Sequence, residues 1–238
     1  MKRFIQISIL SVVLGQLAGC ANNMGHSNQS LISENPRLLP TQQFLPKPEL
    51  DSVSGKRLAY QAAPNPYLEK KQRLKPETIA LFIKAKRSVK DSQLEQAKQY
   101  LKKLIAKDDS VSGPWVLLGD IAVQEKDLES AQNLYKKAIE VNRLNVSAYL
   151  LLSQVLRKRG DYLDAQNVYH EALSVWPDCP EAHLNLGVLY DLYLDHPINA
   201  EKHLSAHQLL TTYRNLAVEK WLDEIEERTG ISRSFPKQ

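Results

Sequence analysis

The chain has 238 residues, of which 43% are apolar and 24% are charged, and it carries a formal net charge of +4 at pH 7. This composition is ordinary for a globular protein and supplies enough apolar residues for a packed core. With only two cysteines, Cys20 and Cys179, the chain has neither a disulfide framework nor the closely spaced thiols of a structural zinc site.

Residues 1–19 have the order of parts of an export signal. Lys2 and Arg3 form a basic head, a mostly apolar stretch covers residues 4–14, and small or aliphatic residues precede Cys20. The apolar stretch is interrupted by polar residues and is shorter than the roughly 20 residues of a membrane-spanning helix. We therefore expect residues 1–19 to be removed as a signal peptide.

The tetrapeptide Leu17-Ala18-Gly19-Cys20 resembles the lipobox of bacterial lipoproteins. The resemblance implies that the chain is cut before Cys20 and that this cysteine is acylated, which would anchor the protein stably because each buried methylene contributes about 0.8 kcal/mol. In enteric-type bacteria an aspartate after the cysteine retains lipoproteins at the inner membrane. Ala21 stands there, so the resemblance implies the periplasmic face of the outer membrane. The alternative is an ordinary secretory signal with a chance cysteine.

Residues 20–75 are expected to form the lipidated N-terminus and a Pro-rich disordered linker. Residues 21–75 contain six prolines and show no sustained apolar periodicity, and as a flexible coil they would span about 40 Å. They hold eight Lys or Arg against four Asp or Glu, whereas residues 76–238 hold 21 against 23. The main part of the chain therefore lacks the basic balance typical of nucleic-acid binding.

A repeat of 34 residues follows the linker. The segments WVLLG (115–119), YLLLS (149–153) and HLNLG (183–187) are 34 residues apart, and small and aromatic residues recur after them at matching places: Ala131 and Ala165, Tyr135 and Tyr169, Ala138 and Ala172. This pattern resembles the tetratricopeptide repeat (TPR), whose unit is a pair of antiparallel helices. The resemblance implies an all-α superhelix over residues 76–213, with units near 78–111, 112–145, 146–179 and 180–214.

Small residues are expected where the two helices of a unit cross. Gly119 should face Ala131 and Ala138 at close approach, whereas Tyr135 should fill a wider part of the unit.

Two glycines are expected to end helices. Gly160 should end one helix and Asp161 should cap the next. An amphipathic segment over residues 215–230, closed by Gly230, should form a capping helix, and residues 231–238 should form a tail.

Catalytic motifs are missing from the sequence. We find no phosphate-binding GxxxxGK or GxGxxG, no GxSxG and no HExxH, so neither an enzyme nor a resident cofactor is expected. His203 and His207 have a spacing that can ligate zinc, without an obvious third ligand, and the alternative is a role in packing. Cys179 is a reactive thiol, a partner in an intermolecular disulfide, or an inert, partly buried thiol.

The basic run Arg157-Lys158-Arg159 admits two interpretations. It could contact an acidic partner, or it could be a solvated helix end whose charge complements the helix dipole.

In the resembled family, peptides often bind a groove lined by the first helix of each unit. We find no paired basic residues of the kind that clamp a terminal carboxylate in chaperone-binding TPR domains. The alternative to a groove is that several of the corresponding residues only pack. Those residues are Phe82, Lys86, Val89, Val116, Asp120, Val123, Leu150, Gln154, Arg157, Leu184, Val188 and Asp191.

Together these features predict a lipid-anchored, non-enzymatic adaptor in the Gram-negative periplasm. It would recruit or position an envelope protein through the groove, and similar TPR lipoproteins serve pilus or secretin assembly or accompany TonB-type transducers. Two alternatives stay open: a scaffold that self-associates through an uncovered end of the superhelix, and an enzyme-like or metal-dependent protein using His203, His207 and Cys179.

Overall fold

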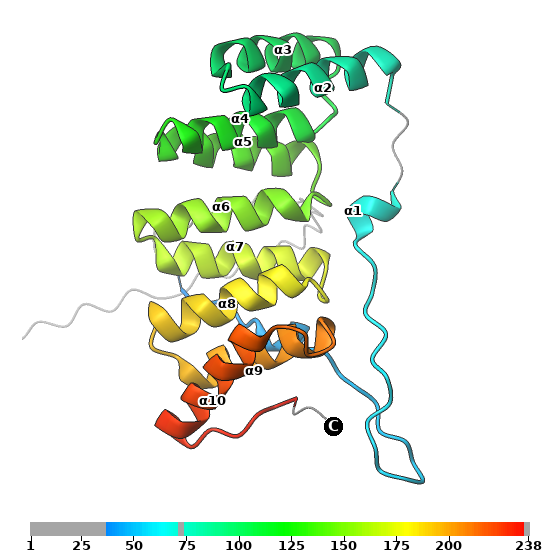
Figure 1. The fold of residues 1–238 in the computed structure, drawn as a ribbon, viewed down its shortest axis with the longest axis vertical. Helices are drawn as coiled ribbons and strands as arrows, with labels where there is room; N and C mark the ends of the chain where they lie inside the picture. The colour runs from blue at the N-terminus through cyan, green and yellow to red at the C-terminus, as the bar shows by residue number, and fades with distance from the viewer. Residues whose placement is uncertain (1–36, 71–73, 236–238) are drawn as a thin grey trace, which may run out of the picture. The chain divides into compact units, whose positions relative to one another are not determined.

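The computed structural model describes residues 37–70 and 74–235 (Figure 1). The expected signal peptide and Cys20 lie outside these residues. Within them, no helix is long and apolar enough to cross a membrane. The helices are η1 (Gln42–Phe44), α1 (Pro66–Glu69), α2 (Pro76–Lys90), α3 (Leu94–Lys107), α4 (Gly113–Gln124), α5 (Leu128–Val141), α6 (Val146–Arg159), α7 (Tyr162–Val175), α8 (Pro180–Leu192), α9 (Pro197–Leu210) and α10 (Leu216–Thr229).

Helices α2 to α9 form four consecutive pairs, each joined by extensive contact between its first and second helix. The pairs follow one another in chain order, and α10 packs on α9 (Figure 1). They begin at Pro76, Gly113, Val146 and Pro180, within two residues of the unit starts expected from the 34-residue period. The predicted all-α repeat fold is therefore confirmed.

Glycine at the crossing point lets the two helices of a pair approach closely. A Cβ atom built on Gly119 would lie 2.5 Å from Cε1 of Tyr135, and one built on Gly187 would lie 2.5 Å from Cγ of Leu204. The prediction that Tyr135 fills a wider part of the unit was wrong, because its ring takes the space that the missing side chain of Gly119 leaves. Ala131 and Ala138 are fully buried nearby in the core.

The turn at Gly160 confirms one prediction and corrects another. Gly160 ends α6 in the left-handed conformation, with φ of 87°, as expected for a helix C-cap. Asp161 precedes α7, but its side chain makes no capping hydrogen bond. Its carboxylate lies 3.1 Å from Nε of Arg159 instead, so an ion pair takes the oxygen that a cap would use.

The expected disordered linker is ordered in part, because residues 37–70 have defined positions against the repeats. Phe44 packs on the main core cluster, and the hydroxyl of Thr41 is buried against α8 and α9. Arg57, further along, donates a 2.8 Å hydrogen bond to the hydroxyl of Tyr213. Apolar and polar side chains between the prolines therefore find partners on the array, which composition alone did not indicate.

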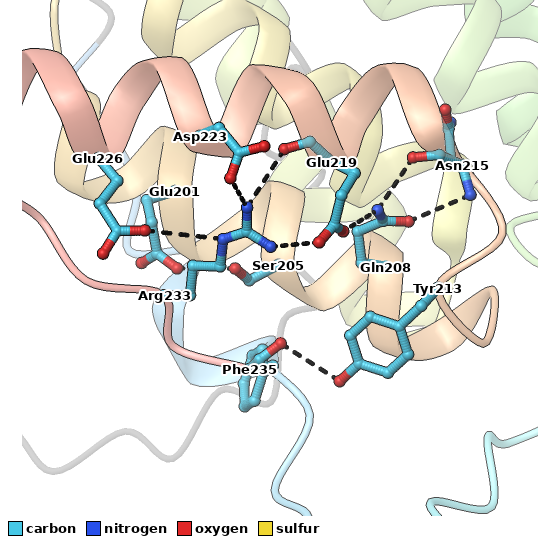
Figure 2. A network of polar contacts seen from close by, with 10 residues as sticks. All are labelled: Glu201, Ser205, Gln208, Tyr213, Asn215, Glu219, Asp223, Glu226, Arg233 and Phe235. Carbon is cyan, nitrogen blue, oxygen red and sulfur yellow. Dashed lines mark hydrogen bonds and ion pairs between the residues drawn. The ribbon is translucent and has the colours of Figure 1, made fainter. Parts of the chain in front are cut away.

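Residues 231–235, expected to be a tail, also pack on the array. Figure 2 shows Arg233 contacting Glu219 and Asp223 of α10. The amide nitrogen and hydroxyl of Ser234 donate to the buried carboxylate of Glu201 on α9, at 2.6 and 2.7 Å. The C-terminal segment therefore links the capping helix to the last repeat.

Candidate functional site

The twelve predicted groove residues are distributed over the first helices of the four pairs, and none of them is fully buried. Lys86 is exposed and the others are half-buried as whole residues, although the side chain of Asp191 is itself buried. The structure brings α2 into contact with α4 and α6 into contact with α8. Each helix carries three of the residues: Phe82, Lys86 and Val89 on α2; Val116, Asp120 and Val123 on α4; Leu150, Gln154 and Arg157 on α6; and Leu184, Val188 and Asp191 on α8.

Half of these residues take part in packing between helices. Phe82 and Val89 lie against the smaller hydrophobic cluster, and the others contact the main one: Val116, Val123, Leu150 and Leu184. The apolar part of this face is thus partly used by the fold itself, while its outer atoms stay accessible.

Two charged residues of this face are bonded within the chain and partly open. Asp120 accepts a 2.7 Å hydrogen bond from the hydroxyl of Tyr135, and burial raises the pKa of its carboxyl. Arg157 donates to the hydroxyl of Tyr193 at 3.3 Å, and its guanidinium carbon lies 5.6 Å from the centre of that ring. Arg157 is half-buried and still presents part of its charge to solvent.

The capping helix covers the last predicted groove residue. Asp191 accepts hydrogen bonds from the indole of Trp221 and from Arg228, and only 4% of its side chain is exposed. The surface open to a ligand on the first helices therefore runs from α2 to the first half of α8.

A second surface, which sequence analysis missed, lies on the second helices α7 and α9 with α8 between them. Residues of the N-terminal segment are bound there. The amide of Leu39 donates to Oε1 of Gln166 at 3.0 Å, and Nε2 of Gln166 donates back to the carbonyl of Leu39 at 2.8 Å. The ring of Phe44 meets His170 edge-on, with centroids 5.1 Å apart. The array thus already binds one short peptide segment, from its own chain, which makes a 3-10 turn over Gln42–Phe44.

Beneath this segment, two histidines form a buried pair. Nε2 of His183 lies 2.8 Å from the carbonyl oxygen of Pro177, which can only accept, so this nitrogen carries the proton. Nδ1 of neutral His183 then accepts from Nδ1 of His203, 2.9 Å away. The pairing therefore assigns one tautomer to each ring.

Three hydroxyl and amide groups extend the pair toward the segment. Nε2 of His203 must accept, so the hydroxyl of Thr41 donates to it at 2.8 Å. The Thr41 oxygen accepts from the hydroxyl of Tyr190 at 2.9 Å, and that oxygen accepts from Nε2 of Gln166 at 3.1 Å. Each group in the chain donates to the next, from Gln166 through Tyr190 and Thr41 to His203, His183 and the carbonyl of Pro177. In this arrangement each imidazole donates through one nitrogen and accepts through the other, so both are neutral.

Burial keeps the two histidines neutral. It lowers the pKa of His183 to about 4 and the pKa of His203 well below its ordinary value, where the neighbouring His183 adds to the effect. A buried imidazolium would lose its hydration, and the attraction of the nearby Asp178 to His183 offsets only part of that cost. The hydrogen-bonded chain is therefore complete at neutral pH.

A second contact holds the segment further along. Asp178 accepts from the hydroxyl of Tyr60 at 2.9 Å and from the amide of Ala63 at 2.7 Å. The indole of Trp176 donates to the carbonyl of Ala63 at 2.7 Å. Burial, helped by Asp178, raises the pKa of Tyr60 to about 12.

The predicted zinc candidates serve in hydrogen bonding. Nδ1 of His207 lies 3.0 Å from the carbonyl of Pro180 and its Nε2 lies 3.1 Å from Nδ2 of Asn215, so both nitrogens of His207, like those of His203, have protein partners. No group of three or more His, Cys, Asp or Glu side chains that could hold a metal lies in residues 37–70 or 74–235. The thiol of Cys179 is buried, which raises its pKa to about 12 and makes it a poor nucleophile.

Residues 41–213 match the model of a family described as the tetratricopeptide repeat protein 21 C-terminal ARM domain. The chain belongs to this family. The match covers both the repeats and the docked segment from Thr41 onward, so it extends beyond the region in which the 34-residue period is visible. A comparison with curated proteins finds no match.

Solved structures share the TPR fold at low sequence identity. PilF of Pseudomonas aeruginosa is 19% identical over 64% of this chain and 68% of its own, with a TM-score of 0.56. MamA of Desulfovibrio magneticus RS-1 is 17% identical over 66% and 88%, with a TM-score of 0.55. YrrB, described as a TPR protein with an unusual peptide-binding site, is 19% identical over 60% and 74%, with a TM-score of 0.50. Repeats of this type are scaffolds for protein interaction.

Proposed function

We propose that this protein is a lipid-anchored, non-enzymatic adaptor of the Gram-negative envelope, held at the periplasmic face of the outer membrane through acylated Cys20. It binds a segment of an envelope protein on its first helices and positions that protein in a pilus- or secretin-type assembly or beside a TonB-type transducer. The observation that supports binding is the open face from α2 to the first half of α8, where eleven of the twelve predicted contact residues keep an accessible side-chain surface and only Asp191 is covered.

The face combines apolar and charged groups in a way that suits a peptide with both kinds of side chain. Lys86 of α2 and Arg157 of α6 offer positive charge, and Leu150 of α6 and Leu184 of α8 are half-buried. Contacts of this kind orient a partner by charge and gain affinity from the apolar side chains.

Capture of envelope proteins tests the proposal. The full chain in detergent serves as bait beside a Lys86→Glu/Arg157→Glu variant, and a Lys84→Glu/Lys158→Glu variant is the control, since these exposed lysines lie on the same helices outside the predicted groove. We expect a partner that the wild type and the control retain and that the groove variant loses, with equal thermal unfolding for all three. Retention by the groove variant would place binding elsewhere and reject the first-helix face.

Self-association is a second candidate, favoured by one observation on the first repeat. Ile79 and Ile83 are 43% and 45% exposed on α2, the helix that begins the array. Two such apolar residues one turn apart suit contact with another copy. Light scattering on the full chain and on an Ile79→Lys/Ile83→Lys variant separates the candidates, because a wild type that is strictly monomeric excludes the scaffold.

A further inference from the structure

The groove that holds Leu39–Phe44 has a counterpart two repeats earlier in the array. Gly119 packs on Tyr135 just as Gly187 packs on Leu204, so α4 corresponds to α8 with an offset of 68 residues and α5 to α9 with an offset of 69. The alanines Ala97 and Ala165, both fully buried, relate α3 to α7 by 68 residues. Helices α3, α4 and α5 therefore repeat the arrangement of α7, α8 and α9.

The corresponding surface between α3 and α5 is an open groove with a volume of about 560 Å³. In the α7–α9 groove, the residues that contact or support the docked segment are Gln166, His170, His183, Tyr190 and His203. Their counterparts all line the open groove and are, in the same order, Lys98, Lys102, Trp115, Ala122 and Leu134.

The substitutions change the size and the polarity of the groove floor. Ala122 stands where Tyr190 fills the other groove, and Leu134 stands where His203 accepts the hydrogen bond of Thr41. The floor is therefore wider and apolar, and it suits a bulky apolar side chain in place of threonine. The indole nitrogen of Trp115, which also lines the groove, is buried without a hydrogen-bond partner among the described residues.

The α3 edge of the groove carries Lys98 and Lys102 where its counterpart carries Gln166 and His170, and Glu125 and Asp127 line the groove as well. Lys98 is paired with Glu95 and Glu125, at 2.8 and 2.7 Å. Lys102 is exposed and makes no ion pair with any residue of the described ranges. It stands where His170 lies 3.3 Å from Gln43 of the docked segment, so an acidic side chain would suit that place of a peptide.

We propose that the groove between α3 and α5 binds a short peptide segment of a partner protein, which places a bulky apolar side chain over Ala122 and Leu134 and an acidic side chain two residues later beside Lys102. The segment lies as Leu39–Phe44 lies in the α7–α9 groove, with the apolar residue at the place of Thr41 and the acidic residue at the place of Gln43. This site is on the second helices and is separate from the face of the first helices.

Labelled peptides based on residues 37–45 test the site on the full chain. The probe is RLLPTQQFL with Thr41→Leu and Gln43→Glu, and the unchanged sequence is its control. Fluorescence polarisation should detect binding of the probe below about 1 mM and weaker binding of the control. Lys102→Glu should weaken the affinity for the probe by at least about fivefold, because it replaces attraction to the glutamate by repulsion. Lys103→Glu, at the next exposed position of α3, should leave the affinity almost unchanged.

Further measurements distinguish this groove from the face of the first helices and a partner peptide from a segment of this chain. Ala122→Tyr introduces the side chain that residue 190 supplies in the other groove, and it should abolish binding of the probe. If the Ala122→Tyr variant unfolds, Lys102→Glu still tests the site. The Lys86→Glu/Arg157→Glu variant should bind the probe like the wild type, which keeps this test independent of the proposed function. Absence of binding, or equal effects of the Lys102 and Lys103 variants, would overturn the proposal.

A peptide of residues 28–36, which places Ile32 and Glu34 at the two required positions, is the competing occupant. If it binds more tightly than the probe, the groove serves a second copy of this chain and the partner assignment is wrong.

Discussion

At the scale of single residues, a few side chains with little freedom decide how closely the helices approach. Gly119 and Gly187 allow contacts that any Cβ atom would prevent, and the alanines of the second helices are fully buried around them. Core interiors are close-packed, so added volume at such places forces neighbouring side chains out of their preferred rotamers.

Gly119→Ala should therefore destabilise the protein by about 1–3 kcal/mol, because the new Cβ would lie 2.5 Å from the ring of Tyr135. Gly113→Ala is the matched control, since its Cβ would meet the nearest atom, Cζ of Phe82, at an ordinary 3.5 Å. Thermal unfolding measures both. Equal melting temperatures for the two variants would contradict the close approach.

The buried histidine pair makes stability depend on pH. The pKa of His183 is about 4 in the folded protein and about 6.5 in the unfolded chain, so the unfolded state binds more protons between these values. Stability is therefore complete above pH 6.5 and falls as the pH falls toward 4, by about 1.4 kcal/mol per pH unit for this residue.

Denaturant unfolding at pH 7.5 and pH 5 checks this expectation. His183 alone should lower the free energy of unfolding by about 2 kcal/mol at pH 5. His183→Gln should be less stable at pH 7.5 and show a flatter pH dependence, whereas His196→Gln, at an exposed position, should behave like the wild type. An unchanged slope in His183→Gln would mean that other groups cause the pH dependence.

At the scale of elements, the helices could be predicted from the sequence and the docked segment could not. The 34-residue period reports contacts that recur within and between neighbouring repeats, so it located all four pairs and the glycines, Gly119 and Gly187, at which the helices of a pair approach closely. The segment over residues 37–45 binds residues more than 100 positions away, and proline-rich composition carries no sign of such partners. The polar side chains at Gln166 and His183, on otherwise apolar helix faces, were the available signal.

At the candidate site, too, the sequence allowed predictions for the periodic residues and not for contacts from outside the repeats. The repeat register predicts which residues of the first helices line the groove, and this stays a prediction; Lys86 is exposed in the structure and most of the others are half-buried. It could not indicate that α10 covers Asp191, because Trp221 and Arg228 come from outside the periodic region.

Thr41→Val tests the importance of the docked segment. The change leaves the hydroxyl of Tyr190 without an acceptor and Nε2 of His203 without a donor, both in a buried place, so we expect a loss of about 1–3 kcal/mol. Hydrogen exchange of the Leu39 amide should become faster at the same time. Ser52→Ala, at an exposed position of the same segment, is the control, and equal exchange in the two variants would contradict the role given to Thr41.

At the scale of the whole molecule, the array is tied at several places to segments outside the repeats. Residues 37–63 contact α7, α8 and α9, and residues 231–235 contact α9 and α10. The third and fourth repeats therefore receive stabilising contacts that the first and second do not share within the described part of the chain. Local unfolding should begin in α2 and α3, where such ties are missing.

Cys20→Ser tests the proposed anchor. The variant cannot be acylated at this position, so we expect it to leave the membrane fraction while its helical circular dichroism and melting temperature match those of the wild type. Continued membrane fractionation after a salt wash would reject the lipid anchor.

The docking of Leu39–Phe44 also determines how the array would carry mechanical load. Tension applied through residue 37 enters the protein at α7 and α9, not at α2, although α2 is the first helix of the repeats. The force that arrives from the anchor therefore reaches the fourth repeat and its neighbour first, and none of it passes along the chain into α2 until the segment peels away from Gln166 and Thr41 loses its partners. Peeling would break the hydrogen bonds of the docked segment one after another before any repeat unfolds. The docked segment would therefore give way first and limit the force that the repeats receive from the anchor.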